Sequence, residues 1–432
     1  MRIVELIERK RDGGTHSRAE LEALVLGYVR GEIPDYQVAG WLMAVCWRGM
    51  APEEVATLTQ VMAASGQQLD LSSIGRPVAD KHSTGGVGDK TSLVVMPLVA
   101  ACGVPVGKMS GRGLGFTGGT IDKLESFAGI RVDLSAHEFV HQLAEIGIVI
   151  TGQSADLAPA DGKLYALRDV TGTVPSLPLI ASSVMSKKLA AGAHVIVLDV
   201  KTGSGAFMRE RAAARELAEA MVRIGTAAGR RVAAVVSDMS QPLGRAVGNA
   251  LEVREALDTL ACAGPAEFTA FAVELAGLIV SLASDDKLGQ ADVEQALRSG
   301  AGLATLRRMI ASQGGDTAGF DDRSHLPTAR RQVPLSADAH GWIERLDALA
   351  VARASIALGA GRERKGDPID LAVGIELQAK IGDAVHRGEP LAVLHVNDDR
   401  NLAQAQSLLA EAISISDQPV EPPAVILDRL TR

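Results

Sequence analysis

Short β-branched runs alternate with apolar helical segments from about residue 74 onward. The helical segments are 91–102 and an Ala-rich stretch before residue 231, and the runs are 104–109, 148–151, 194–201 and 231–237. Neighbouring parallel strands need long crossover connections, which helices usually supply. The alternation therefore predicts an α/β fold whose sheet is mixed and mainly parallel.

The chain is too long for a single ordinary core, and its pattern changes near both ends. Its 432 residues predict two or three domains. Residues 1–65 predict a small all-helical domain, because Ser17 and Glu20 form a capping box and Pro52 begins a further helix. We expect residues 160–192 to pack onto this domain, and residues 70–158 and 193–325 to form the α/β domain.

The last quarter of the chain has a different character. A polar stretch rich in Gly, Asp, Arg and Pro at 314–334 predicts a linker. Beyond it we expect a C-terminal α+β domain, residues 335–432. Its segment 373–396 predicts barrel-sandwich-like hairpins with turns at Gly382 and Gly388.

Composition limits the partners of this chain. The formal net charge of −8 provides no basic surface for a nucleic-acid backbone. The three cysteines have no CxxC spacing, so neither a disulfide framework nor a zinc site is predicted. The N-terminus lacks the apolar segment of a signal peptide, and no later run has the length of a membrane span. We expect a cytoplasmic protein with no nucleic-acid or membrane partner.

Two glycine-rich loops are the strongest functional signal. Ten of the 45 glycines lie between residues 85 and 119, and each loop follows a predicted strand and precedes a predicted helix. Backbone N–H groups at such helix starts favour an anion. The loops add cations and hydroxyls at Lys81, Ser83, Ser92, Lys108, Ser110 and Thr120. They are not a P-loop, because Asp89 stands where that motif requires Gly. We interpret them as a phosphate site.

A dinucleotide-binding loop is a second interpretation of the same glycines. Gly113, Gly115 and Gly118 satisfy GxGxxG, and Asp133 follows about where a ribose-binding acid would stand. This motif alone is weak, and it leaves the first loop unexplained. We therefore favour the phosphate site.

A third cluster lies between residues 165 and 189. It places four polar residues among apolar Leu167, Ile180 and Val184; these four are Tyr165, Arg168, Ser183 and Lys187. Ser183 and Lys187 are four residues apart and share one helical face. An apolar slot with a few fixed donors suits a planar heterocycle. Taken alone, such a cluster is also typical of a solvated helix end.

Together these motifs resemble the thymidine and pyrimidine-nucleoside phosphorylase family. The resemblance rests on KHSTGGVGDKTSLV, SGRGLGFTGGTIDKLESF, DGKLYALRDVT and DVKTGSGAFM, and it extends over essentially the whole chain. It implies a homodimer formed through the helical domain, with the active site between that domain and the α/β domain. It also implies reversible phosphorolysis of uridine, thymidine and deoxyuridine to the free base and α-D-(deoxy)ribose 1-phosphate.

The resemblance also implies residue roles. Phosphate would bind the six residues named above for the loops. The base would meet Leu114, Tyr165, Arg168, Ile180, Ser183, Val184, Lys187 and Phe207. His82, Arg168 and Lys187 would be catalytic. His82 would face the base near the glycosidic bond, either as a proton donor or only as an orienting group.

Two positions make this chain distinctive within the resemblance. Phe116 replaces a histidine that relatives usually carry. Lys108 resembles relatives that accept uridine as well as thymidine, so we expect a broad pyrimidine-nucleoside enzyme. Strict thymidine phosphorylase is the alternative, and a phosphoribosyltransferase or a non-catalytic nucleoside-binding protein is more distant.

The resemblance also bears on whether this chain binds a monovalent cation. Some relatives bind a potassium-type ion through backbone oxygens and a carboxylate, and the matching positions are Gly88, Leu243, Ala246 and Glu255. Lys90 stands where those relatives carry Thr, and its ammonium would repel a cation. We expect no required cofactor and keep K⁺ as an alternative.

Overall fold

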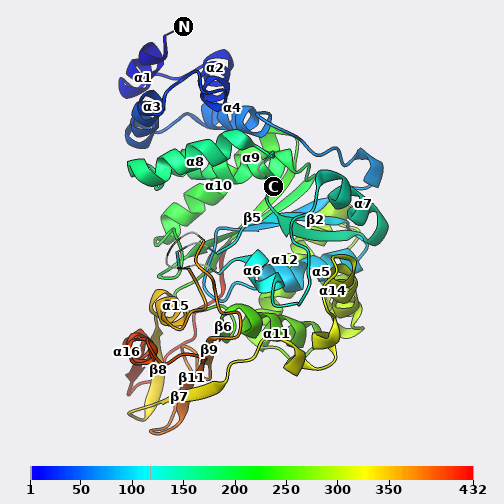
Figure 1. The fold of residues 1–432 in the computed structure, drawn as a ribbon, viewed down its shortest axis with the longest axis vertical. Coiled ribbons are helices and arrows are strands. Elements are labelled where there is room, and N and C mark those ends of the chain that lie inside the picture. The colour runs from blue at the N-terminus through cyan, green and yellow to red at the C-terminus, as the bar shows by residue number, and fades with distance from the viewer. Residues whose placement is uncertain are drawn as a thin grey trace.

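The computed structural model describes residues 2–113, 115–116, 118–154, 156–362, 364 and 366–431. Figure 1 shows the N-terminal helices at the top, the central sheet in the middle and the C-terminal hairpins at the bottom. The site residues discussed below lie where the first two of these parts meet.

Four N-terminal helices form the first part of the chain. They are α1 (Ile3–Arg11), α2 (Arg18–Val29), α3 (Asp35–Arg48) and α4 (Pro52–Ala63). The predicted capping box begins α2: Ser17 Oγ accepts from the Glu20 N–H, and the Glu20 carboxylate accepts from the Ser17 N–H. Helices α8 (Pro159–Thr171) and α9 (Leu177–Ala190) complete this unit, because Leu164 and Leu179 join its apolar core.

The central sheet has six strands in the order β13-β5-β4-β1-β2-β3. Its parallel strands are β1 (Ala79–Ser83), β2 (Val106–Ser110), β3 (Ile148–Gly152), β4 (Val195–Thr202) and β5 (Arg231–Asp238). Strand β13 (Ile426–Leu430) is antiparallel to β5. The predicted fold class, an α/β domain with a mixed, mainly parallel sheet, is confirmed.

The helices of the α/β domain pack on both faces of this sheet or on the helices that cover it. They are α5 (Thr91–Ala101), α6 (Thr120–Leu124), α7 (Ala136–Ile146), α10 (Arg211–Ala227), α11 (Asn249–Leu260), α12 (Ala266–Ser284), α13 (Gln290–Arg298) and α14 (Ala301–Ser312). Apolar side chains of α5, α11, α12 and α14 form one core layer, and those of α9 and α10 form another. The sheet is therefore buried on both faces, as its apolar strands require.

Helix α12 differs from the sequence expectation about membrane spans. Its 19 residues are long and apolar enough to cross a membrane by length and composition. However, Phe268, Phe271, Leu275 and Ile279 are buried in the core that α12 shares with α5. We interpret α12 as a core helix of this domain.

The C-terminal part contains two small sheets. One has the order β6-β9-β11-β7, with β6 (Ala246–Val247), β9 (Gly374–Leu377), β11 (Pro390–Val396) and β7 (Arg331–Ser336). The other has the order β10-β8-β12, with β10 (Ala384–Val385), β8 (Gly341–Leu346) and β12 (Ile413–Ser416). Helices α15 (Ala348–Ala357) and α16 (Leu402–Ala412) pack beside them. The described residues also contain three single-turn 3₁₀ helices, at Ser72–Ile74, Ala318–Phe320 and Arg323–His325.

Two strands link this part to the α/β domain. Strand β6 lies within the segment expected to be α/β, yet it pairs with β9. Strand β13 lies within the segment expected to be C-terminal, yet it pairs with β5. The two parts are thus joined by backbone hydrogen bonds in addition to the linker.

Candidate functional site

The carboxyl ends of β1, β2 and β4 gather the phosphate candidates at one edge of the sheet. Ala79 of β1 pairs with Val106 of β2, so Lys81 and Lys108, two residues further along, lie side by side on these strands. Ser83 and Ser110 end the same strands, and Asp199 of β4 is paired with Ser83. In parallel α/β sheets this edge is where ligands bind.

Lys81 is a buried cation without a hydrogen-bond partner among the described residues. Its side chain is 0% exposed, and its Nζ lies 3.4 Å from Asp199 Oδ2 and 3.8 Å from Asp89 Oδ1. Lys201, also buried, lies 2.7 Å from the same Asp199 oxygen. Lys81 is thus ion-paired with two carboxylates, and its N–H donors remain available to an anionic ligand placed beside it.

Asp89 organises the first glycine-rich loop. Its carboxylate accepts from the hydroxyls of Ser83 and Thr91, and the Thr91 N–H lies 3.3 Å away. Burial works to raise the pKa of Asp89, but Lys81, Lys201 and these hydroxyls hold it well below its usual range. Helix α5 begins at Thr91, and Ser92 is buried in its first turn. Its N-terminus therefore lies close to the strand-end lysines.

The second loop leads into α6, which begins at Thr120. Arg112 is bound by Glu125 through contacts of 2.6 and 2.8 Å, so its guanidinium is already paired. The Asp122 carboxylate accepts from Arg112 and also from Arg362, a residue of the C-terminal part. The two hydrogen bonds from Arg362 are 3.0 and 2.8 Å long. Arg112 is therefore engaged by Glu125 within the protein. Thr120, by contrast, is the first residue of α6.

The surroundings of Lys108 disfavour its charged form. Its Nζ donates to the Lys81 carbonyl at 2.6 Å and lies 3.9 Å from Asp80. Burial, followed by the charge of Lys188, lowers the pKa of Lys108 to about 7. An anion placed beside it would stabilise the charged form.

The base candidates lie on α8 and α9. Lys187 contacts Asp161 Oδ2 at 2.5 Å and Ser183 Oγ at 3.2 Å, so these three side chains form one polar group. Arg168 is buried and donates to three carbonyls, those of Thr173, Val174 and Leu179. A guanidinium has five N–H groups, so donors remain for a ligand.

His82 follows Lys81 on β1 and is influenced by the charges of lysines from both groups of side chains. Burial, then the charges of Lys188, Lys108, Lys187 and Lys81, lowers the pKa of His82 well below its ordinary value. Two of these lysines belong to the strand ends and two to α9. These surroundings favour the neutral form of the His82 imidazole.

Apolar side chains border this region. Phe207 is 54% exposed and packs against Phe116 with ring centroids 5.3 Å apart. Ile180 and Val184 are partly buried on α9, and the Arg168 guanidinium lies 5.8 Å from the Tyr165 ring. Leu114, also predicted to contact the base, lies outside the described residues.

The residues expected to bind a monovalent cation are held by Lys90. Its Nζ donates to the carbonyls of Leu243 at 2.6 Å and Ala246 at 3.1 Å, and it forms an ion pair with Glu255. These are the oxygens that would otherwise be available to the ion. The residues present therefore do not fit an additional cation at this place.

Sequence reasoning missed the carboxylates that hold the site together. Asp80, Asp161 and Asp199 each pair with a lysine near the candidate residues. A signal was present: the predicted strand 194–201 contains Asp199 near Lys201, and Asp80 stands beside Lys81 directly before the first loop. Charged residues in a buried strand are rarely tolerated unless they are paired.

Comparisons with known proteins agree with this architecture. Three family models match: the helical bundle domain of a glycosyl transferase family at residues 4–66, its a/b domain at 75–303, and a pyrimidine nucleoside phosphorylase C-terminal domain at 342–416. Pyrimidine-nucleoside phosphorylase of Geobacillus stearothermophilus is 51% identical over 434 residues, covering 100% of both chains. The protein of the same name from Staphylococcus haemolyticus (strain JCSC1435) is 51% identical, covering 98% of both.

A solved structure shows the same fold at lower identity. Anthranilate phosphoribosyltransferase from Thermus thermophilus superposes with a TM-score of 0.57 and 20% identity. The match covers 71% of this chain and 98% of that one. At this identity the similarity supports the fold alone.

Proposed function

The chain belongs to the pyrimidine-nucleoside phosphorylase family of glycosyl transferases, and we propose that it cleaves pyrimidine nucleosides with inorganic phosphate. The products are the free base and α-D-(deoxy)ribose 1-phosphate, and the reaction is reversible. The observation that carries this proposal is the buried Lys81 ammonium, which lacks a hydrogen-bond partner among the described residues. It lies on β1, and the adjacent His82 is close enough to Lys187 on α9 for the lysine charge to lower its pKa.

The proposed chemistry is one displacement at C1′ of the sugar. A phosphate oxygen forms the new bond to C1′ while the bond to base N1 breaks, and the electron pair of that bond goes to the base. Negative charge then grows on the base oxygens, where Arg168 and Lys187 stabilise it more than in the ground state. The base then takes up the proton that hydrogen phosphate loses, which gives the neutral free base and the sugar 1-phosphate dianion. Because no protein nucleophile takes part, the anomeric centre is inverted.

We assign phosphate binding to the strand-end and helix-start residues Lys81, Ser83, Ser92, Lys108, Ser110 and Thr120. We assign base binding to Tyr165, Arg168, Ile180, Ser183, Val184, Lys187 and Phe207. The contact of Phe207 with Phe116 supports a pocket that is drier than one with histidine at position 116. Water exclusion strengthens the charge interactions of Arg168 and Lys187.

For His82 we favour the orienting role over the proton donor. The low pKa of its imidazole leaves little imidazolium at neutral pH. A neutral ring still offers one N–H donor and one acceptor to a base or sugar.

We propose that the enzyme accepts ribosides as well as deoxyribosides. Lys108 is placed at the phosphate edge of the site, where its Nζ can donate to a ribose 2′-OH. Strict thymidine phosphorylase is the alternative. A Lys108→Met variant separates the two, because it should lower kcat/KM for uridine more than for thymidine.

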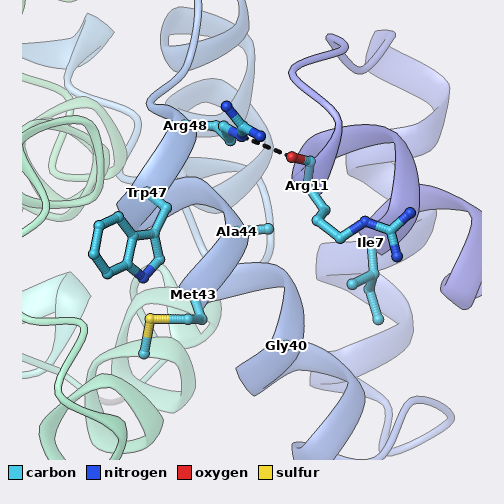
Figure 2. Close-up of a pocket in the computed structure, with 7 residues that line it drawn as sticks. All are labelled: Ile7, Arg11, Gly40, Met43, Ala44, Trp47 and Arg48. Atoms are coloured by element: carbon cyan, nitrogen blue, oxygen red, sulfur yellow. Dashed lines mark hydrogen bonds between the residues drawn. The ribbon is translucent and has the colours of Figure 1, made fainter.

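We further propose a cytoplasmic homodimer that forms through the helical domain. Figure 2 shows Met43 and Trp47 on one side of α3 and Ile7 and Arg11 on α1, around a groove of about 530 Å³. Trp47 is 81% exposed, which is unusual for a tryptophan of a monomeric surface. Exposed aromatic side chains beside a groove are typical of interfaces between copies of one chain.

The experiment that tests the proposed reaction compares uridine, thymidine and cytidine, each with and without inorganic phosphate. Base release that requires phosphate supports the proposal. Equal release without phosphate would instead indicate hydrolysis.

A further inference from the structure

The Nζ of Lys90 lies among oxygen atoms from two other segments of the chain. The Leu243 carbonyl comes from the loop before β6, the Ala246 carbonyl from the first residue of β6, and the Glu255 carboxylate from α11. Lys90 is 0% exposed and Glu255 is also buried. Backbone carbonyls and a carboxylate are the kinds of oxygen ligand that K⁺ takes in proteins.

The backbone around this ammonium is closely fitted to it. Gly244 has φ +66°, and a Cβ there would lie 2.7 Å from Lys90 Nζ. Gly88 has φ +68°, and a Cβ there would lie 2.7 Å from the Leu243 carbonyl oxygen. Both positions therefore require glycine, and the close approach turns the carbonyls toward the cation.

The negative charge in the cluster is also fully engaged. The Glu255 carboxylate accepts from the N–H groups of Arg245 at 2.7 Å and Ala246 at 2.9 Å, besides pairing with Lys90. The Lys90 ammonium thus balances the charge of the Glu255 carboxylate, and it also donates to the Leu243 and Ala246 carbonyls. Within the described residues, the Glu255 charge that an additional cation would need is already balanced by Lys90.

We propose that Lys90 is a covalently tethered substitute for a bound monovalent cation, so that this protein needs no potassium where some relatives use it. The ammonium joins two functional parts of the molecule. Lys90 directly precedes α5, whose first turn contains Ser92, and the 243–246 segment includes the first residue of β6, which pairs with β9. Unlike a bound ion, this link cannot dissociate at low salt.

The test uses Lys90→Thr, which restores the residue of the ion-binding relatives and removes the ammonium. The variant is expressed and purified in potassium buffer, so that the vacated position can fill during folding. Wild type and variant are then dialysed into tetramethylammonium chloride and titrated with KCl at constant ionic strength. Thermal unfolding and phosphate-dependent base release are measured at each point.

We expect the wild type to keep its Tm and its rate throughout the titration. We expect Lys90→Thr to unfold at lower temperature without potassium and to recover Tm and rate as KCl is added, because an ion that binds only the folded state stabilises it. Potassium stimulation of the wild type would overturn the proposal. A folded Lys90→Thr protein that is indifferent to potassium would overturn it as well.

Lys380→Met is the matched control. Lys380 is a second buried lysine beside the same loop, and it donates to the carbonyls of Pro242 at 2.5 Å and Gly244 at 2.9 Å. Its carboxylate neighbour, Glu267, is 3.8 Å away and 42% exposed. Loss of this ammonium should lower Tm without creating a potassium response, and a potassium response equal to that of Lys90→Thr would contradict the assignment.

Two further safeguards keep the result interpretable. Lys90→Ser offers a second vacated position if the Thr variant does not fold, and the wild-type titration needs no variant. The Tm measurement does not depend on the proposed reaction, whereas the rate does. A potassium-dependent Tm without any base release would therefore support the tethered cation and count against the proposed function.

Discussion

The Nζ of Lys188 on α9 lies 2.7 Å from Oδ2 of Asp80 on β1, and both side chains are buried. This ion pair joins the helix that carries Ser183 and Lys187 to the strand that carries Lys81 and His82. It is a direct connection between the two sets of candidate residues.

Replacing Lys188 by Met should lower the free energy of unfolding by about 3–5 kcal/mol, because Asp80 keeps a buried charge without its close partner. Urea unfolding measures the change. Lys163→Met on α8 is the control, since Lys163 is exposed and donates to the carbonyls of Tyr28 and Val29, without a carboxylate partner among the described residues. Adding Asp80→Asn to Lys188→Met should recover part of the loss, and additive losses would contradict the pairing.

The low pKa of His82 predicts the pH dependence of the reaction. Burial and four lysines favour the neutral ring, so no essential imidazolium is lost as pH rises through the ordinary value of 6.5. At saturating phosphate, where the charge of Lys108 no longer limits anion binding, we expect kcat/KM for uridine to show no alkaline decline caused by His82 near that pH, and His82→Gln to keep the shape of the wild-type profile. A decline near pH 6.5 that disappears in His82→Gln would assign the proton-donor role instead.

Lys108 predicts how anion affinity changes with pH. Its pKa is about 7 in the free protein, so it is charged below this pH and loses its charge above it. Binding of a dianion requires the charged form, and affinity should therefore fall above pH 7 by up to about tenfold per pH unit. Sulfate is the suitable probe because its own charge is constant in this range.

Calorimetric titration with sulfate at several pH values measures this effect. Lys108→Met should bind sulfate more weakly at pH 6 to 7 and lose this pH dependence, and Lys108→Arg should stay charged and keep its affinity above pH 7. An unchanged pH dependence in Lys108→Met would show that another group titrates.

The proposed dimer predicts the effect of a charge at Trp47. Trp47→Glu should weaken self-association by at least about 30-fold, because a buried interface tryptophan commonly contributes about 2 kcal/mol or more. Sedimentation velocity over a range of concentrations measures the change. Ala410→Glu, at an exposed position of α16, introduces the same charge elsewhere and should leave association unaltered. A wild-type monomer at all concentrations would refute the proposal.

Much of the fold could be predicted because local patterns and packing agree here. The runs at 148–151 and 231–237 became strands within one residue of their expected ends, since both are β-branched and buried. The return of β13 to the sheet could not be predicted, because Ile426–Leu430 is a short segment whose partner lies almost 200 residues earlier. The local sequence of a strand does not indicate which distant strand it pairs with.

The site shows the same limit at the level of side chains. The glycines and lysines between residues 81 and 120 indicated an anion site. They did not indicate that Lys81 on β1 pairs with Asp199 on the neighbouring strand β4. At Lys90 the sequence predicted repulsion of a cation, whereas the structure gives the ammonium the same oxygens that an ion would use. Whether the Lys90 ammonium repels a nearby cation or occupies the cation's own position depends on where its flexible side chain ends, and sequence does not give that position.

The most direct test of the proposed reaction is to incubate the purified protein with uridine or thymidine, with and without inorganic phosphate, and to quantify free base and sugar 1-phosphate. Lys187→Met, checked for folding, is the control that links the activity to this site; its turnover should fall by about 10²–10³. We predict that both nucleosides release base only with phosphate, with one equivalent of the α-sugar 1-phosphate. Release without phosphate, or no release by the folded wild-type protein, would contradict the proposed function.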